Sequence, residues 1–118
     1  MPDCVFCAIV AGTEPATVVR EWWDAIAIVP LNPVTDGHVL VIPRQHVQDA
    51  ASEPLLTGIT ARCAAELIGP SVDAFNLITS AGRDATQTVM HLHWLIVPRI
   101  AGDGLHLPWT GQEVHGDA

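Results

Sequence analysis

Hydrophobic and polar positions alternate most clearly between Gln87 and Arg99. Read as a β-strand, this stretch sorts its side chains onto two faces, because successive residues point to opposite sides of a sheet. One face is wholly apolar and comprises Met90, Leu92, Trp94 and Ile96. The other carries two histidines and comprises Val89, His91, His93 and Leu95. Packing rarely calls for two imidazoles on one face of a strand, so His91 and His93 are the first candidates for a functional site.

The same kind of pattern predicts further strands over residues 17–22, 25–29, 38–43 and 74–79. In the third of these, Val39 and Val41 are expected on one face and His38, Leu40 and Ile42 on the other. The connections between neighbouring strands are short enough for hairpins, which favours antiparallel pairing.

Two helices complete the predicted set. A short one is expected from Asp3, as its N-cap, to about Val10, with Gly12 ending it. A long one is expected from Glu53 to Ile68, capped by Ser52. Its expected buried stripe comprises Leu55, Ile59, Cys63 and Leu67. The sequence therefore predicts a single α+β domain over residues 1–118, with an antiparallel sheet of about five strands and an irregular tail from about residue 100.

Charge narrows the classes of partner. The 118 residues carry a net charge of −8, and all five basic residues are arginines. A chain of this kind is not expected to bind nucleic acid through a broad positive field. A phosphate would have to be held locally, by backbone N–H groups, hydroxyls or one or two arginines. Arg83 and Arg99 are nevertheless expected to be solvated surface residues.

Hydropathy bears on location and assembly. No apolar stretch approaches the ~20 residues of a membrane span, and the polar start of the chain does not resemble a signal peptide. We therefore expect a cytoplasmic protein without membrane contact. Only 15% of residues are charged, which hints at a subunit interface.

A candidate metal site begins with Cys4 and Cys7. Their spacing alone fits two buried cysteines or a redox pair equally well. His46 follows the strand 38–43, although a surface histidine is an equally good interpretation of that residue taken alone. Together with His91 they make two thiolates and two imidazoles, the ligand set of a closed structural Zn²⁺ site. Such a site would attach the short N-terminal helix to the sheet.

If His91 binds metal, His93 is left free to act as base or nucleophile. Gln87, Thr88 and the loop 80–86 offer hydrogen-bond donors suited to an anion, although polar residues at the entry to a strand are equally ordinary. His38 is on another strand and is a candidate for the same pocket.

These motifs together resemble a known family. The run Gln87-Thr88-Val89-Met90-His91-Leu92-His93, followed by Val97-Pro98-Arg99, resembles the histidine-triad (HIT) signature. Residues 37–46 resemble the family's second conserved block, and residues 4–16 resemble the start of its zinc-binding bacterial members. The resemblance spans roughly residues 4 to 99, in order and with the expected spacing, and implies a HIT-like fold.

The resemblance implies a nucleoside-phosphate hydrolase or nucleotidyl transferase that forms a covalent nucleotidyl-histidine on His93. The implied substrate is a purine nucleoside phosphoramidate or a dinucleoside polyphosphate, and the implied assembly is a homodimer. Structural zinc, with no catalytic metal, would be held by Cys4, Cys7, His46 and His91. The implied substrate-binding residues are Asn32, His38, Ser80, Gln87 and Thr88.

The chain departs from the family pattern at four positions. Leu95 replaces the third triad histidine, and Pro30 stands where an acidic residue contacts the ribose. Ser80 replaces an asparagine and Thr86 a glycine. The uridylyltransferase branch of the superfamily also lacks a third histidine while keeping its nucleophile. A nucleotide-binding regulatory module with weak or no turnover, or a small zinc-stapled interaction domain, therefore stays open as an alternative.

Overall fold

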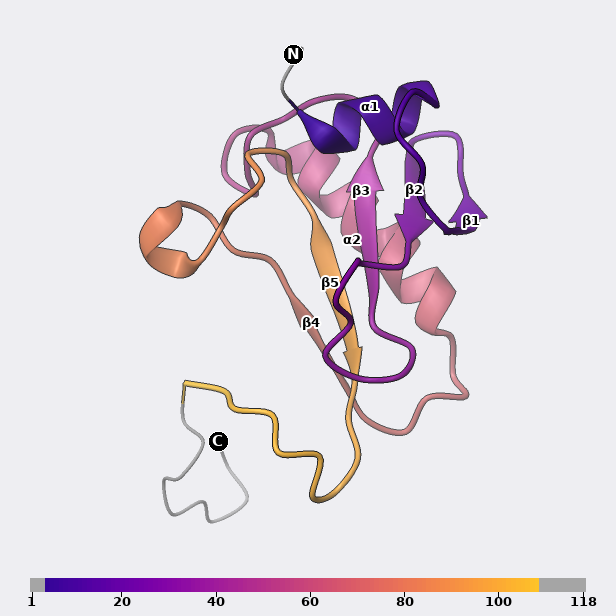
Figure 1. Cartoon of the computed structure of the whole chain (residues 1–118), viewed down its shortest axis with the longest axis vertical. Coiled ribbons are helices and arrows are strands. Elements are labelled where there is room, and N and C mark those ends of the chain that lie inside the picture. Colours follow the sequence, from indigo (N-terminus) through magenta and orange to yellow (C-terminus); the bar gives the residue numbers. More distant parts are fainter. Residues whose placement is uncertain (1–3, 109–118) are drawn as a thin grey trace.

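The structure, a computed structural model, describes residues 4–108. Its sheet has five antiparallel strands in the order β1-β2-β3-β5-β4 (Figure 1). The strands are β1 (Val18–Glu21), β2 (Ala25–Ile28), β3 (Val39–Pro43), β4 (Phe75–Ile78) and β5 (Trp94–Pro98). The helices are α1 (Val5–Ala11), α2 (Pro54–Ile68) and the short 3₁₀ helix η1 (Arg83–Ala85). The predicted α+β fold, with its antiparallel sheet and one long helix, is confirmed.

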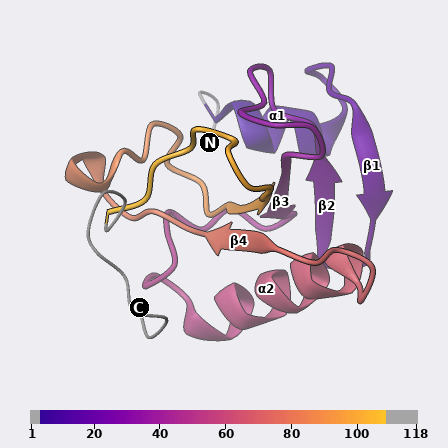
Figure 2. The ribbon, with the colours of Figure 1, turned by 90° about the horizontal axis from the view of Figure 1, so that it is seen from below.

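The two faces of the sheet are covered by different helices. Figure 2 shows α2 along one face and α1 on the opposite side. Alternate residues of β3 serve the two sides, as predicted: Val39 and Val41 pack toward α2, whereas Leu40 and Ile42 pack with Phe6 of α1. The candidate site lies at the α1 side of the sheet, because His91 and His93 both contact Phe6.

Helix α2 differs from its prediction in cap and in stripe. Glu53, not Ser52, is the N-cap, and its carboxylate accepts a hydrogen bond from the Leu56 N–H at 2.7 Å. Ser52 instead donates to Asp49. The buried positions are Leu56, Thr60, Cys63, Ala64 and Ile68. The predicted stripe is confirmed at Cys63, and Leu67 packs on the same core, but it is wrong at Leu55, which is exposed. Thr60 is buried as well, because its hydroxyl donates to the Leu56 carbonyl within the helix.

The predicted strand from Gln87 is wrong over its first half, since β5 begins only at Trp94. Residues 87–93 instead run against the segment that follows β3. The Leu92 N–H donates to the Val47 carbonyl at 2.8 Å, and Leu92 packs with Val47 and Leu56. These contacts replace strand pairing, so His91 and His93 precede the strand rather than share one of its faces.

Both ends of the described chain bear on the predictions. The N-cap of α1 is Cys4, whose sulfur accepts from the Cys7 N–H, while Asp3 lies outside the described residues. Gly12, at φ 80°, ends the helix as predicted. Arg99 is not a solvated arginine, because it is half-buried and paired with Asp103 at 2.8 Å. Residues 100–108 form no helix or strand, and the rest of the predicted tail lies outside the described range.

The length and hydropathy of the helices bear on whether the chain can span a membrane. Between residues 4 and 108, no helix combines the length and the apolar character needed to cross a bilayer.

Candidate functional site

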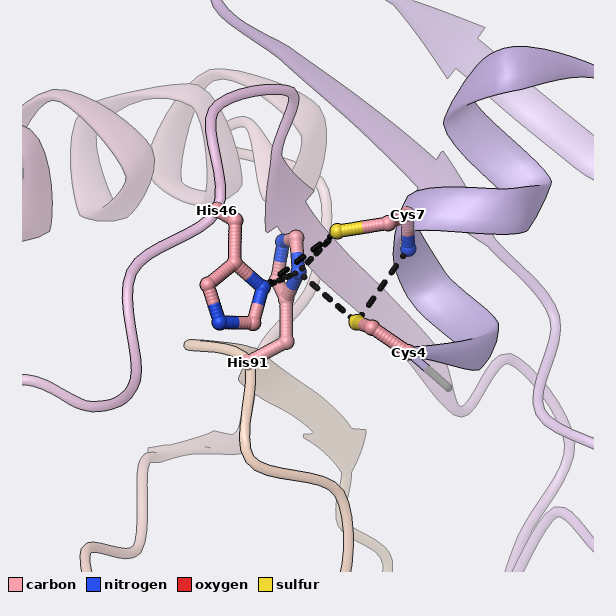
Figure 3. Close-up of side chains that lie close together, drawn as sticks. All are labelled: Cys4, Cys7, His46 and His91. Atoms are coloured by element: carbon pink, nitrogen blue, oxygen red, sulfur yellow. Dashed lines mark hydrogen bonds between the residues drawn. The ribbon is translucent and has the colours of Figure 1, made fainter. Parts of the chain in front are cut away.

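Four potential metal ligands from three separate segments converge beside α1 (Figure 3). Cys4 and Cys7 come from the start of the helix, His46 from the turn after β3, and His91 from the segment before β5. Their ligand atoms all lie within 4.8 Å of one another. Cys4 Sγ is 3.3 Å from His91 Nδ1, and Cys7 Sγ is 3.3 Å from His46 Nδ1 and 3.5 Å from His91 Nδ1. The two Nδ1 atoms are 3.2 Å apart.

These separations fit a tetrahedral zinc ion. Zinc–sulfur distances of about 2.3 Å and zinc–nitrogen distances of about 2.0 Å place neighbouring ligand atoms roughly 3.3 to 3.8 Å apart. His91 Nε2 lies 2.9 Å from the Pro43 carbonyl, which can only accept, so Nε2 carries the proton and Nδ1 presents its lone pair. The four residues therefore form a group that could hold a metal.

Burial favours the neutral forms of both His91 and Cys7. His91 is fully buried, and this burial lowers its pKa against the opposing effect of its hydrogen bond to Pro43. The imidazole is thus neutral, as a ligand must be. Burial raises the pKa of the Cys7 thiol, and neighbouring Cys4 raises it further. A metal would have to displace the thiol proton, so its binding would weaken in acid.

His93 lies beside the metal-ligand group and is half-buried. Its Nδ1 is 2.8 Å from the His91 carbonyl oxygen, so Nδ1 donates and Nε2 keeps its lone pair. The ring also meets the Phe6 ring nearly at right angles, with centroids 5.2 Å apart. A neutral imidazole with its tautomer fixed in this way can act as a nucleophile or a base.

Strand register places the other candidates along β5. Ile78, two residues before Ser80, pairs with Leu95, two residues after His93, so Ser80 and His93 lie just beyond the same end of the β4–β5 pair. Leu40 also pairs with Leu95, which puts His38 opposite Val97, toward the far end of the strand. Ser80 therefore lies at the His93 end, and His38 about four residues farther along the sheet.

His38 is buried with one ring nitrogen unused. Its Nδ1 accepts from the Val34 N–H at 3.1 Å, so Nε2 carries the proton. Among residues 4–108, Nε2 of His38 has no hydrogen-bond partner although the side chain is only 5% exposed. Burial lowers the pKa of His38, which keeps the ring neutral. An unpaired buried donor of this kind is costly and suits a ligand group.

The sequence and the fold match known proteins. Residues 11–102 match the family described as HIT domain. The chain belongs to the HIT family. It is 38% identical over 108 residues to an uncharacterised HIT-like protein of Mycobacterium tuberculosis, covering 86% of this chain and 75% of that protein. It is 32% identical over 122 residues to adenosine 5′-monophosphoramidase hnt1 of Schizosaccharomyces pombe, covering 95% and 86%.

A solved HIT structure supports the fold and the metal group. The crystal structure of a zinc-bound histidine-triad family protein from Mycobacterium smegmatis superimposes with a TM-score of 0.78 at 37% identity, covering 89% of this chain and 81% of that one. The predicted HIT-like fold is therefore confirmed.

Three predicted substrate-binding residues of this HIT domain differ in their burial. The Gln87 amide is used within the protein: its Oε1 accepts from the Gly82 N–H at 2.8 Å, and its Nε2 donates to the Gln48 carbonyl at 2.7 Å. It thereby holds the loop that leads to His93. Thr88, which follows it, and Asn32, in the loop between β2 and β3, are both exposed.

Two further features were not predicted: the backbone conformation of Thr86, which replaces a glycine of the family pattern, and the ring contacts of Phe6. Thr86 has φ 71°, in the left-handed region that β-branched residues avoid, and it is the non-glycine residue with positive φ in the described chain. Phe6, between the two cysteines, contacts both His91 and His93. Its position inside the Cys-x-x-Cys motif is the sequence signal that places it near the metal ligands.

Proposed function

We propose that this HIT domain is a nucleoside-phosphate hydrolase or nucleotidyl transferase that forms a covalent nucleotidyl-histidine on His93. The observation that carries the proposal is the 2.8 Å hydrogen bond from His93 Nδ1 to the His91 carbonyl, because it reserves Nε2 as the nucleophile. The substrates proposed are purine nucleoside phosphoramidates or dinucleoside polyphosphates. The phosphoramidase activity named for the S. pombe relative supports this class.

The reaction proceeds in two balanced steps. The lone pair of His93 Nε2 attacks the α-phosphorus, and the bond to the leaving group breaks as the new P–N bond forms. The leaving group takes the bonding electrons and a proton from solvent. Water then attacks the phosphorus and gives up one proton to solvent as the P–N bond breaks, with the bonding electrons returning to Nε2; the nucleoside monophosphate departs, and another acceptor in place of water gives transfer.

The remaining candidates would bind the substrate. Ser80, which lies beyond the same end of the β4–β5 pair as His93, and Thr88 would offer hydroxyl groups to the phosphate. Gln87 contributes through the loop that its amide holds between Gly82 and Gln48. His38, with its free Nε2–H, and Asn32 would contact the nucleoside.

We assign a structural zinc ion to Cys4, Cys7, His46 and His91. All four ligands come from the protein, which closes the site to substrate, and the ion would join α1 to the segments after β3 and before β5. Metal analysis of the wild type against Cys4→Ser tests this assignment. A metal-free wild type, unchanged in stability by the substitution, would exclude it.

We also propose a homodimer. Val18 and Val19 on edge strand β1, and Phe75 on edge strand β4, leave apolar surface for a second copy to cover. Sedimentation velocity measures the assembly, and a concentration-independent monomer would contradict it.

The enzymatic proposal is tested with adenosine phosphoramidate and a diadenosine polyphosphate. We expect adenosine monophosphate as product and, after acid-free quenching, a nucleotide linked to His93 in the mass spectrum. The matched control is His106→Ala, which removes an exposed histidine of the C-terminal segment and should leave both results unchanged. If the wild type shows no turnover and no adduct, the enzymatic proposal is excluded.

A nucleotide-binding regulatory module is the second candidate. It is favoured by Leu95, which we propose stands at the third triad position and which packs with the apolar cluster of Leu40 and Ile42. That module would bind adenosine monophosphate in calorimetry without turning over either substrate. Binding with turnover would exclude it.

A further inference from the structure

Phe6 contacts both His93 and His91, one of the four potential metal ligands. It is the second residue of α1, between Cys4 and Cys7, and only 7% of it is exposed. Its ring packs on the sheet face formed by Ile26, Ile28, Leu40 and Ile42. The backbone on either side of Phe6 is thus fixed by the cysteines, while the sheet holds its side chain.

The ring of Phe6 contacts both histidines edge-on. Its centroid is 5.7 Å from that of His91, at an interplanar angle of 84°, and 5.2 Å from that of His93, at 80°. Perpendicular rings at this spacing attract, because the positive edge of one meets the negative face of the other. One aromatic side chain therefore touches a metal ligand and the nucleophile at once.

Two contacts restrain the ring of His93, and each involves a potential metal ligand or its neighbour in the chain. One is the hydrogen bond from Nδ1 to the carbonyl of His91, itself a candidate ligand. The other is the ring of Phe6, which directly precedes the candidate ligand Cys7. The hydrogen bond holds only one nitrogen, whereas the contact with Phe6 limits rotation of the whole ring away from the carbonyl.

We propose that Phe6 is a positioning residue for His93, which makes the metal group a rigid support for the nucleophile. The inference rests on the proposed function of His93 and adds to it the residue that sets the ring orientation. Loss of Phe6 would let the His93 ring leave its carbonyl partner and populate the other neutral tautomer. Misplacement of a reacting group by about 1 Å can cost roughly 10²-fold in rate.

The test compares Phe6→Leu with Ile9→Ala. Ile9 is one turn farther along α1 and packs on the same apolar cluster, so its truncation controls for loosening of the helix. For Phe6→Leu we expect bound zinc to be retained, kcat to fall about 10- to 100-fold, and KM to change by less than about 3-fold. Ile9→Ala should keep kcat within about 3-fold of the wild type.

A second measurement separates this inference from the proposed function. Long-range ¹H–¹⁵N correlation spectra at mildly alkaline pH report which nitrogen of His93 carries its proton. We expect the Nδ1–H tautomer in wild type and Ile9→Ala, and a mixture in Phe6→Leu. If the wild type shows no turnover, the proposed function fails. The tautomer of His93 in Phe6→Leu, compared with that in the wild type, then decides whether Phe6 positions the ring.

An unchanged kcat and tautomer in zinc-loaded Phe6→Leu would overturn the inference. So would an equal loss of kcat in Ile9→Ala, because that would be a general effect of the helix. Where Phe6→Leu does not fold, Phe6→Met, which refills the space with a flexible apolar side chain, carries the same comparison.

Discussion

The two ends of β5 carry different kinds of polar side chain. Before its first residue, ring nitrogens and sulfurs face one another, with the Nδ1 atoms of His46 and His91 only 3.2 Å apart. After its last residue, Arg99 donates to both carboxylate oxygens of Asp103, at 2.8 and 3.0 Å, and to Asn76 at 2.7 Å. One end gathers four potential metal ligands, and the other pairs the Arg99 guanidinium with protein acceptors.

The two ends therefore differ in role: the start of β5 carries the candidate functional groups, whereas the Arg99 end stabilises the fold. The four potential ligands could hold a cation, and the unprotonated Nε2 of His93 could attack an electrophile. The start of β5 therefore offers positions for groups from outside the chain. The Arg99 end is complete in itself, so changes there should alter stability while leaving turnover intact.

His93→Ala should give the largest effect. Turnover of the preferred substrate should fall by about 10³-fold or more, because the proposed nucleophile is removed. Stability should fall by only about 1 kcal/mol, since His93 is half-buried and makes one hydrogen bond to the backbone. Substrate assays and thermal denaturation measure the two. A loss of stability as large as that of His91→Ala would make His93 a structural residue.

His91→Ala should cost the most stability. It removes a wholly buried ring that bonds Pro43 and joins the metal group, so the free energy of unfolding should fall by about 4 kcal/mol or more. Chelation should lower the melting temperature of the wild type and leave that of the variant unchanged. His106→Ala, an exposed histidine, is the matched control. Equal sensitivity to chelator in His91→Ala would remove His91 from the ligand set.

Leu95→His probes the strand between the two ends. The new imidazole would be a diagonal neighbour of His38, whose Nε2–H has no partner in the described chain, and a proton donor near His93. Phosphoramidate turnover should rise about 10-fold relative to polyphosphate turnover, because an amine leaving group needs a proton more than a phosphate does.

Leu95→Met is the control for Leu95→His, since it conserves volume and adds no donor. It should leave the ratio of the two turnover rates unchanged. Equal gains in both variants would show that packing, and not proton donation, limits the rate.

The same contrast explains what the sequence could predict. The continuous run of apolar residues placed Val39 to Pro43 correctly, because both faces of β3 are buried. It failed from Gln87 to His93, where hydrogen bonds to Val47 and Gln48 override strand pairing. Those partners are about forty residues away, and no local pattern announces them.

The sequence predicted which residues belong to the site better than it predicted their hydrogen-bond partners. Spacing and ligand chemistry brought Cys4, Cys7, His46 and His91 into one hypothesis, and the structure brings them together. The tautomers of His91 and His93 depend on carbonyl groups that only the fold supplies. Arg99 was misassigned for the same reason, because Asp103 reaches it through a turn that the sequence does not specify.

Acid should weaken the far end of β5. The hydrogen bond from Arg99, followed by that from the Leu105 N–H, holds the pKa of Asp103 well below the ordinary 3.8. Because the folded pKa is depressed, this contribution to stability is complete above about pH 4 and is lost as the pH falls toward the folded pKa. Denaturation at a series of pH values should show the loss in the wild type.

Asp103→Asn should be less stable than the wild type near neutral pH, and the difference should shrink below about pH 4. Its turnover near neutral pH should match the wild type, because the network lies beyond the end of the strand remote from His93. A difference in stability that stays constant from neutral pH into strong acid would contradict the assignment of the ion pair.

Thr86→Gly should have the smallest effect and the opposite sign. Thr86 ends η1 at φ 71°, and its N–H donates to the Arg83 carbonyl at 2.9 Å. Glycine adopts this conformation without the clash of a β-branched side chain, so the variant should gain about 1 kcal/mol of unfolding free energy. Ala85→Gly, one residue earlier and without positive φ, should instead lose stability. Urea denaturation compares them. If both glycines destabilise equally, the positive φ at Thr86 stores no strain, and the loop before His93 is as relaxed as the Arg99 end.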